Sequence, residues 1–268
     1  MRTILAALFL CFATSAKAFG PECATDPLPH LLRTTVMLER MFDKDERYFD
    51  QKEFKWVEGI QGTAWFVDKQ TIATIGHVAT SAKLDGSWKE VTLAWSDGKD
   101  EETSLALQVH VQLKDIIVGP ENLEPIMTLE LEIPIDDAFV APIRYTPLQN
   151  KEAVVGLGYR DGALRFAHGY LNYPKPSSEP SDSDPPPKPY LPFELFDADE
   201  SKNDRYVFDH GASGSPLFDC DGNVVAVVQA MMEWPFPAGK VFGRTTTTSA
   251  WGDANMTGVS TANMGKQK

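Results

Sequence analysis

Residue types that would favour nucleic-acid or metal binding are scarce or unsuitably spaced in this chain of 268 residues. Its 25 lysines and arginines are outnumbered by 38 aspartates and glutamates, which gives a formal net charge of −13. Phosphate binding needs a basic stripe, and none is visible. No C-x-x-C or H-E-x-x-H spacing indicates zinc, and no EF-hand spacing indicates calcium. We therefore predict no nucleic-acid partner, no metal and no other cofactor.

Long apolar runs are equally rare, and the one that exists lies near the N-terminus. Residues 4–13 are apolar, follow Arg2, and precede Ala16-Lys17-Ala18, which has the A-x-A form of a cleavage site. The run is too short to cross a bilayer. We interpret residues 1–18 as a signal peptide, which predicts a periplasmic or secreted protein with no membrane partner after cleavage. An uncleaved anchor is the alternative.

Cysteine is also scarce. Of the three cysteines, Cys11 lies in the predicted leader, which leaves Cys23 and Cys220. Disulfides form in the oxidising compartments that exported proteins enter, and two cysteines permit a single connectivity. A disulfide between Cys23 and Cys220 is one interpretation of this pair, and two unpaired buried thiols are the other.

Short segments of the β type run through much of the chain. They are rich in β-branched or aromatic residues and are separated by turn signals. These segments are residues 91–95, 105–113, 153–157, 164–173 and 224–230. Residues 221–223 (D-G-N) predict a hairpin turn before the last of them. With 43% hydrophobic residues, the pattern predicts an all-β domain with a large core.

Three segments fit the strand pattern less well. Residues 31–42 carry apolar residues at mixed helical spacing and predict either a short helix or an extended arm. Residues 174–192 are rich in proline and acids, which predicts a solvated loop that serves as a lid or docking site, or is a plain surface insertion. Residues 246–268 are small and polar and predict a flexible tail.

A serine stands between two glycines in residues 211–216, which read G-A-S-G-S-P. A serine hydroxyl is a poor nucleophile unless a base and a shaped backbone activate it. Gly211 and Gly214 permit a sharp turn and leave backbone N–H groups free to face a substrate oxygen. The segment therefore makes Ser213 a candidate nucleophile.

Candidate partners for this serine stand upstream. Residues 62–67 and 71–78 are two β-type runs joined by a short turn, and the second run ends near His77. Residues 135–140 place Asp136 at the start of an apolar strand, where an acid is costly to bury unless an imidazole or another partner faces it. Asp137 is the rival, because neighbours in a strand face opposite sides. The remaining histidines are interpreted as packed or solvated residues: His30, His110 and His168.

Together these motifs resemble the chymotrypsin-like (trypsin-like) serine peptidases, particularly their bacterial branch, over residues 62–230. The resemblance implies two packed six-stranded antiparallel barrels, the first carrying His77 and Asp136 and the second carrying Ser213. It implies that Ser213 attacks a protein or peptide substrate, that His77 moves the proton, and that Asp136 orients the imidazole. Backbone N–H groups of Gly211 and Ser213 would form the oxyanion hole. A catalytically silent binding protein on the same fold is the alternative function.

The resemblance also bears on specificity and activation. Val207 stands where trypsin has its pocket aspartate, which argues against selection of arginine or lysine, although Asp209 would reach that place if the loop shifts by two residues. His210 falls at the rim of the pocket, and Val228 on the strand that lines it. Ala212 replaces the aspartate that pairs with a new N-terminal amine in trypsin-like zymogens. We therefore expect no activation by N-terminal insertion.

The chain is divided accordingly into four parts. These are the signal peptide 1–18, an N-terminal arm 19–60 that leads into the first barrel, a peptidase domain 61–245 that includes the insertion 174–192, and the tail 246–268. The sequence does not predict an oligomeric state.

Overall fold

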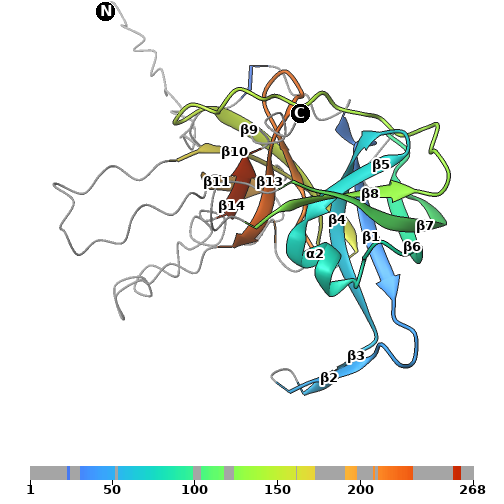
Figure 1. Ribbon diagram of the computed structural model, residues 1–268. Coiled ribbons are helices and arrows are strands. Elements are labelled where there is room, and N and C mark those ends of the chain that lie inside the picture. The colour runs from blue at the N-terminus through green and yellow to red at the C-terminus, as the bar shows by residue number, and fades with distance from the viewer. Residues whose placement is uncertain are drawn as a thin grey trace, which may run out of the picture.

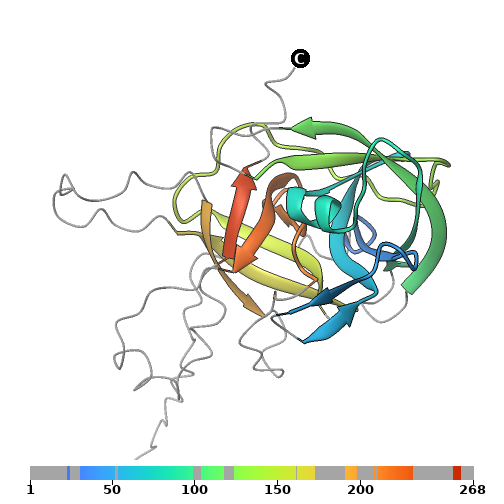
Figure 2. The same cartoon turned by 60° about the horizontal axis from the view of Figure 1, so that its bottom comes forward.

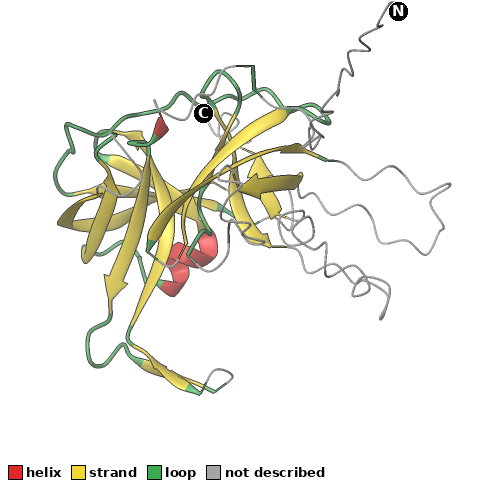
Figure 3. Ribbon diagram, turned by 180° about the vertical axis from the view of Figure 1, so that it is seen from behind, coloured by secondary structure: helices red, strands yellow, loops and turns green. Residues whose placement is uncertain are grey.

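Strands form almost all of the regular structure (Figure 3). The computed structural model describes residues 23–24, 31–51, 54–98, 104–117, 124–160, 162–172, 191–197, 208, 211–231 and 256–260. The predicted leader, most of the proline-rich insertion, and Val207, Asp209 and His210 lie outside these residues. No helix among the described residues has the length and apolar character that crossing a membrane requires.

The first barrel is a closed antiparallel sheet in the order β1-β4-β5-β8-β7-β6. Its strands are β1 (Thr35–Met41), β4 (Gly59–Asp68), β5 (Thr71–Ile75), β6 (Lys89–Ser96), β7 (Ser104–Ile117) and β8 (Ile126–Leu131). Alternate residues of each strand point inward, and they fill the barrel with buried side chains such as Leu38, Phe66, Leu93 and Leu129. Phe66 and Trp95 meet edge to face in this core, with ring centroids 6.1 Å apart.

The second barrel closes in the order β10-β11-β14-β13-β12-β9. Its strands are β9 (Ala153–Arg160), β10 (Ala163–Leu171), β11 (Leu191–Asp197), β12 (Pro216–Phe218), β13 (Val224–Met231) and β14 (Met256–Ser260). The two six-stranded antiparallel barrels confirm the predicted fold class. The five predicted strands correspond to β6, β7, β9, β10 and β13, and Gly222, at φ 81°, forms the predicted turn before β13.

A third group of buried side chains joins the two barrels. Trp65 and Ile75 of the first barrel pack in one cluster with Leu157, Phe218 and Val227 of the second. All five are fully or almost fully buried. Because β4 and β5 supply residues to this shared core, the strands that precede the candidate histidine are fixed against the second barrel.

A two-stranded hairpin projects from the first barrel, away from its body (Figures 1 and 2). Strands β2 (Tyr48–Asp50) and β3 (Lys55–Val57) form it. At its base the buried Arg40 binds Glu46 at 2.5 Å. Burial acts to raise the pKa of Glu46, but the hydrogen bond from Arg40 and the neighbouring charges outweigh it and leave this pKa below its usual value.

The N-terminal part of the first barrel differs from the prediction. Only Leu31 of residues 31–42 is helical; most of the segment is β1, whose Val36, Leu38 and Arg40 point inward at a spacing of two. The charged Arg40 interrupts the apolar alternation, and its guanidinium is satisfied by the carbonyl of Ala82 and by Glu46. The first barrel therefore begins inside the segment that we predicted as an arm.

The C-terminal boundary of the peptidase domain also differs from the predicted residue 245. β14 lies within residues 246–268, which we predicted as a flexible tail, yet it is the strand between β11 and β13 that closes the second barrel. Its sequence, M-T-G-V-S, contains no apolar run, and its pairing with β11 and β13 places it in the barrel.

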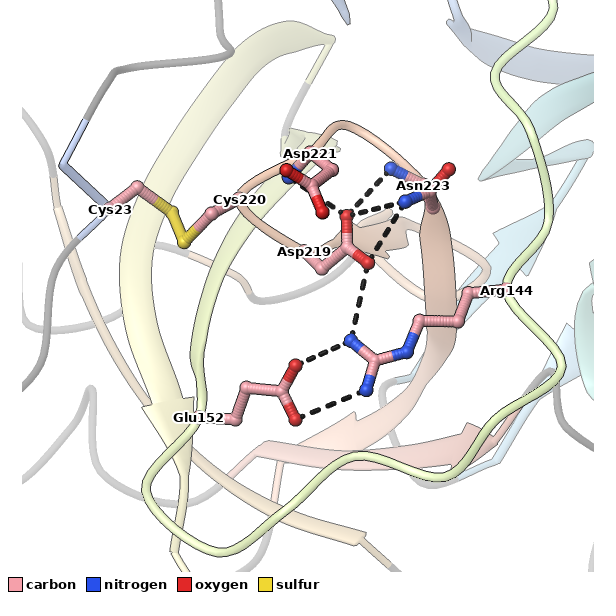
Figure 4. The surroundings of a disulfide bond; sticks show 7 residues. All are labelled: Cys23, Arg144, Glu152, Asp219, Cys220, Asp221 and Asn223. Carbon is pink, nitrogen blue, oxygen red and sulfur yellow. Dashed lines mark hydrogen bonds and ion pairs between the residues drawn. A yellow bond between two sulfur atoms is a disulfide. The ribbon is translucent and has the colours of Figure 1, made fainter.

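Cys23 and Cys220 form the predicted disulfide, with Cα atoms 5.2 Å apart (Figure 4). Cys220 lies in the turn between β12 and β13, beside the buried Asp219. One carboxylate oxygen of Asp219 accepts the backbone N–H of Asn223 at 2.9 Å, and the other binds Arg144 at 3.3 Å. The hydrogen bond to Glu152 contributes most to holding the pKa of Arg144 above its usual value, against the effect of burial. The N-terminal segment is thus fastened to an ordered turn of the second barrel.

Candidate active site

His77 is the second residue of the short helix α2 (Gly76–Ser81), which follows β5 directly. Its Nδ1 lies 2.8 Å from Oε1 of Glu124, and the same oxygen accepts the backbone N–H of His77. The two segments approach closely, because Gly76 donates its N–H to the carbonyl of Pro125 at 2.8 Å and a Cβ on Gly76 would lie 3.1 Å from the proline ring. The imidazole side chain is 44% exposed and the carboxylate side chain 19%, so His77 faces solvent while Glu124 is shielded behind it.

The structure does not bring Asp136 to His77. Residues 135–140 form no strand; Ile135 and Ala138 are buried on either side of a turn whose acids, Asp136 and Asp137, are exposed. The turn is fastened to Lys69, whose carbonyl accepts the N–H of Ile135 at 2.8 Å. Lys69 lies before β5 and His77 lies after it. At about 3.3 Å per residue, the length of β5 alone places the turn of Asp136 roughly 13 Å from His77.

Glu124 is therefore the residue that the sequence did not point to. It stands two residues before β8, and β8 pairs with β5 so that Ile126 lies opposite Ile75. This pairing places the residues just before β8 beside those just after β5. In the sequence, both Glu124 and Asp136 stand before an apolar segment, and only the segment after Glu124 forms a strand that pairs with β5.

Ser213 lies in a turn between the two barrels that we call the nucleophile loop, residues 211–215. Gly211 and Gly214 take φ values of 94° and 91°, in the left-handed region that glycine adopts without strain. The Ser213 side chain is half-buried, and its Oγ lies 3.4 Å from the carbonyl oxygen of Gln229. The sharp turn expected from the glycines is thus present.

Strand β4 contacts both the helix that carries His77 and the nucleophile loop. A Cβ on Gly62 would lie 2.5 Å from Cγ1 of Val78, which shows how closely β4 approaches α2. The next residue, Thr63, donates its backbone N–H to the carbonyl of Ser213 at 2.9 Å. His77 and Ser213 are therefore held on either side of two consecutive residues of one strand.

Thr74 adds a second link between the same two regions. Its hydroxyl donates to the carbonyl of Thr63 at 2.7 Å, three residues before His77. A Cβ on Gly214 would lie 2.4 Å from that hydroxyl and 2.0 Å from the carbonyl of Thr63. His77 and Ser213 do not hydrogen-bond to each other among the described contacts, and in free enzymes such bonds often tighten only with substrate.

The remaining predicted site residues are placed as follows. Val228 is buried in the core of the second barrel, and its backbone accepts the N–H of Gly214 and donates to the carbonyl of Ser215, both at 2.8 Å. Within the described residues, the N–H groups of Gly211 and Ser213 donate to no backbone carbonyl.

His110 is exposed and binds Glu132, and His168 lies on β10. No group of three or more potential metal ligands occurs in the described parts of the chain.

The arrangement has the parts that acyl transfer requires: a hydroxyl, an imidazole held by a carboxylate, and N–H groups beside the hydroxyl that donate to no backbone carbonyl in the described part of the chain. A family model for the trypsin-like peptidase domain matches residues 62–227, which is more than half of the chain. The chain therefore belongs to the trypsin-like peptidase family. No curated protein matches it.

Proposed function

We propose that the protein is a serine endopeptidase whose catalytic residues are Ser213, His77 and Glu124. The observation that carries the proposal is the single carboxylate oxygen of Glu124 that meets both Nδ1 and the backbone N–H of His77. This pair fixes the ring in one tautomer, with Nδ1 protonated toward the carboxylate and Nε2 available as a base. Glu124 takes the role that the sequence motif suggested for Asp136.

The reaction follows the general scheme of serine peptidases. His77 Nε2 takes the proton of Ser213 as Oγ attacks the carbonyl carbon of the scissile bond, and Glu124 stabilises the imidazolium that forms. The imidazolium then gives its proton to the leaving amine, which leaves an acyl group on Ser213. Water, deprotonated by the same imidazole, hydrolyses this ester and restores the serine.

The developing oxyanion is bound by backbone donors in this proposal. The N–H groups of Gly211 and Ser213 donate to no described backbone carbonyl, which leaves them available to a substrate oxygen. Loss of one such donor typically costs about 2.7–4 kcal/mol of barrier. This feature favours an active peptidase over a silent binding protein on the same fold.

The compartment is part of the proposal. A Cys23–Cys220 disulfide requires an oxidising environment, which supports export of the mature chain to the periplasm or the exterior. The substrates would then be proteins or peptides of that compartment.

Cleavage of a peptide library tests the proposal. Wild-type protein is expected to hydrolyse members of the library, and Ser213→Ala is expected to lose on the order of 10⁶ in turnover. Equal cleavage by the two proteins would show that Ser213 is not the nucleophile. No cleavage by a folded wild-type protein would favour the silent binding protein.

A further inference from the structure

The nucleophile loop is held by two buried hydroxyls, and this inference rests on the proposed peptidase function. We propose that Thr63 and Ser215 are positioning residues that keep the oxyanion hole formed without help from an N-terminal amine. Each is fully buried. Between them they bind the carbonyl oxygens of three consecutive residues, Gly211 to Ser213, and so fix the orientation of each peptide plane.

Ser215 sets the direction of one oxyanion donor. Its Oγ donates to the carbonyl of Ala212 at 2.5 Å, and its backbone N–H donates to the same oxygen at 3.0 Å. In a trans peptide the carbonyl of one residue and the N–H of the next point in opposite directions. With the Ala212 carbonyl turned into the protein, the N–H of Ser213 is turned out of it, toward the place of a substrate oxygen.

Thr63 holds the other two carbonyls of the loop. Its Oγ1 donates to the carbonyl of Gly211 at 2.8 Å and accepts the backbone N–H of Tyr159 at 3.0 Å. Its own N–H donates to the carbonyl of Ser213 at 2.9 Å. A hydroxyl is both donor and acceptor, so Thr63 joins β4, β9 and the nucleophile loop in a way that valine, of the same shape, does not.

The surrounding strands leave room for both hydroxyls. A Cβ on Gly158 would lie 1.9 Å from Oγ of Ser215, so β9 accommodates the serine only because it has glycine at that position. The next residue of β9, Tyr159, donates its backbone N–H to Oγ1 of Thr63. Two consecutive residues of β9 therefore fit the two hydroxyls, which indicates a specific arrangement of β4, β9 and the loop.

Ala212 shows why such a device is needed. Its side chain is a fully buried methyl group, which cannot form the ion pair that orders this loop in trypsin-like zymogens after cleavage. An oxyanion loop without that ion pair needs other contacts to stay open. The hydroxyls of Thr63 and Ser215 supply them from residues already present in the barrels.

Steady-state kinetics of Thr63→Val and Ser215→Ala test the inference on a peptide that wild type cleaves. We expect kcat to fall by about 10- to 100-fold in each variant, with KM changed by less than about threefold, because only the transition state carries the oxyanion. The inhibition constant of a peptide aldehyde, whose adduct resembles that oxyanion, should rise by the same factor as kcat falls. Thr63→Ser, unlike Thr63→Val, keeps the hydroxyl and should have the kcat of wild type.

The matched control is Thr35→Val, which removes a hydroxyl that is fully buried on β1 and has no hydrogen-bond partner among the residues that the structure describes. It should leave kcat, KM and aldehyde inhibition unchanged. A chain whose N-terminal amine is acetylated after leader removal should keep wild-type activity. Unchanged kcat in Ser215→Ala would overturn the inference, and so would activity that requires the free amine.

The outcomes separate this inference from the proposed function. If wild type cleaves no peptide, the proposed function fails first. If wild type is active and both hydroxyl variants match it, only the positioning role fails. Near-ultraviolet circular dichroism tests whether Thr63→Val folds. If it does not fold, Ser215→Ala decides the question, because this variant keeps the backbone hydrogen bond to Ala212 and is expected to fold.

Discussion

At the scale of residues, the acid that contacts His77 departs most from the sequence motif, because it is Glu124. The D-x-A pattern favoured Asp136, yet that side chain lies on an exposed turn beside Lys69. Sequence order alone does not say which acid lies beside the histidine, because that depends on the register between β5 and β8. The sharp turn around Ser213 was predictable because local glycines set it, whereas the catalytic roles of Ser213 and His77 stay predictions.

Two isosteric substitutions distinguish the acids. Glu124→Gln should lower kcat by about 10⁴-fold, because an amide in place of the carboxylate favours the wrong tautomer of His77 and does not stabilise the imidazolium. Asp136→Asn should leave kcat and KM at wild-type values. Kinetics on one peptide substrate measure both. A large loss in Asp136→Asn with an active Glu124→Gln would restore the original assignment.

At the scale of elements, strands with alternating apolar residues were predictable and strands that lack this pattern were not. β6, β7, β9, β10 and β13 follow the expected segments. β1 was concealed by the inward-facing Arg40, and β14 by the short, mixed sequence M-T-G-V-S. In both cases the strand is fixed by its neighbours in the barrel, and a local pattern does not contain that information.

The disulfide acts at this scale, because it fastens the N-terminal segment to the turn between β12 and β13. Its cysteines are separated by 197 residues, and a cross-link over so long a loop stabilises by about 5 kcal/mol on chain-entropy grounds. We expect reductant to lower the unfolding temperature of wild type strongly. A Cys23→Ser, Cys220→Ser double variant should already unfold at the lower temperature, with no response to reductant. A wild-type protein indifferent to reductant would show that the cross-link does not stabilise the fold.

At the scale of the whole molecule, the site depends on two barrels that share a core. Trp65 and Ile75 come from the first barrel, and Leu157 and Phe218 pack with them from the second. This core fixes β4 and β5 against β9 and β12, and those strands border the histidine helix and the nucleophile loop. The two-barrel architecture was predictable from the family resemblance, whereas the contacts across the barrels, such as those of Thr63, required the structure.

The most direct test of the proposed peptidase function is covalent labelling with a fluorophosphonate, read by intact mass and peptide mapping. A serine activated by His77 and faced by an oxyanion hole reacts with this probe, whereas ordinary surface serines do not. We predict one adduct on wild-type protein, located on Ser213, and a greatly slowed reaction in His77→Ala. No adduct on folded wild type, an adduct on another serine, or equal labelling of His77→Ala would contradict it.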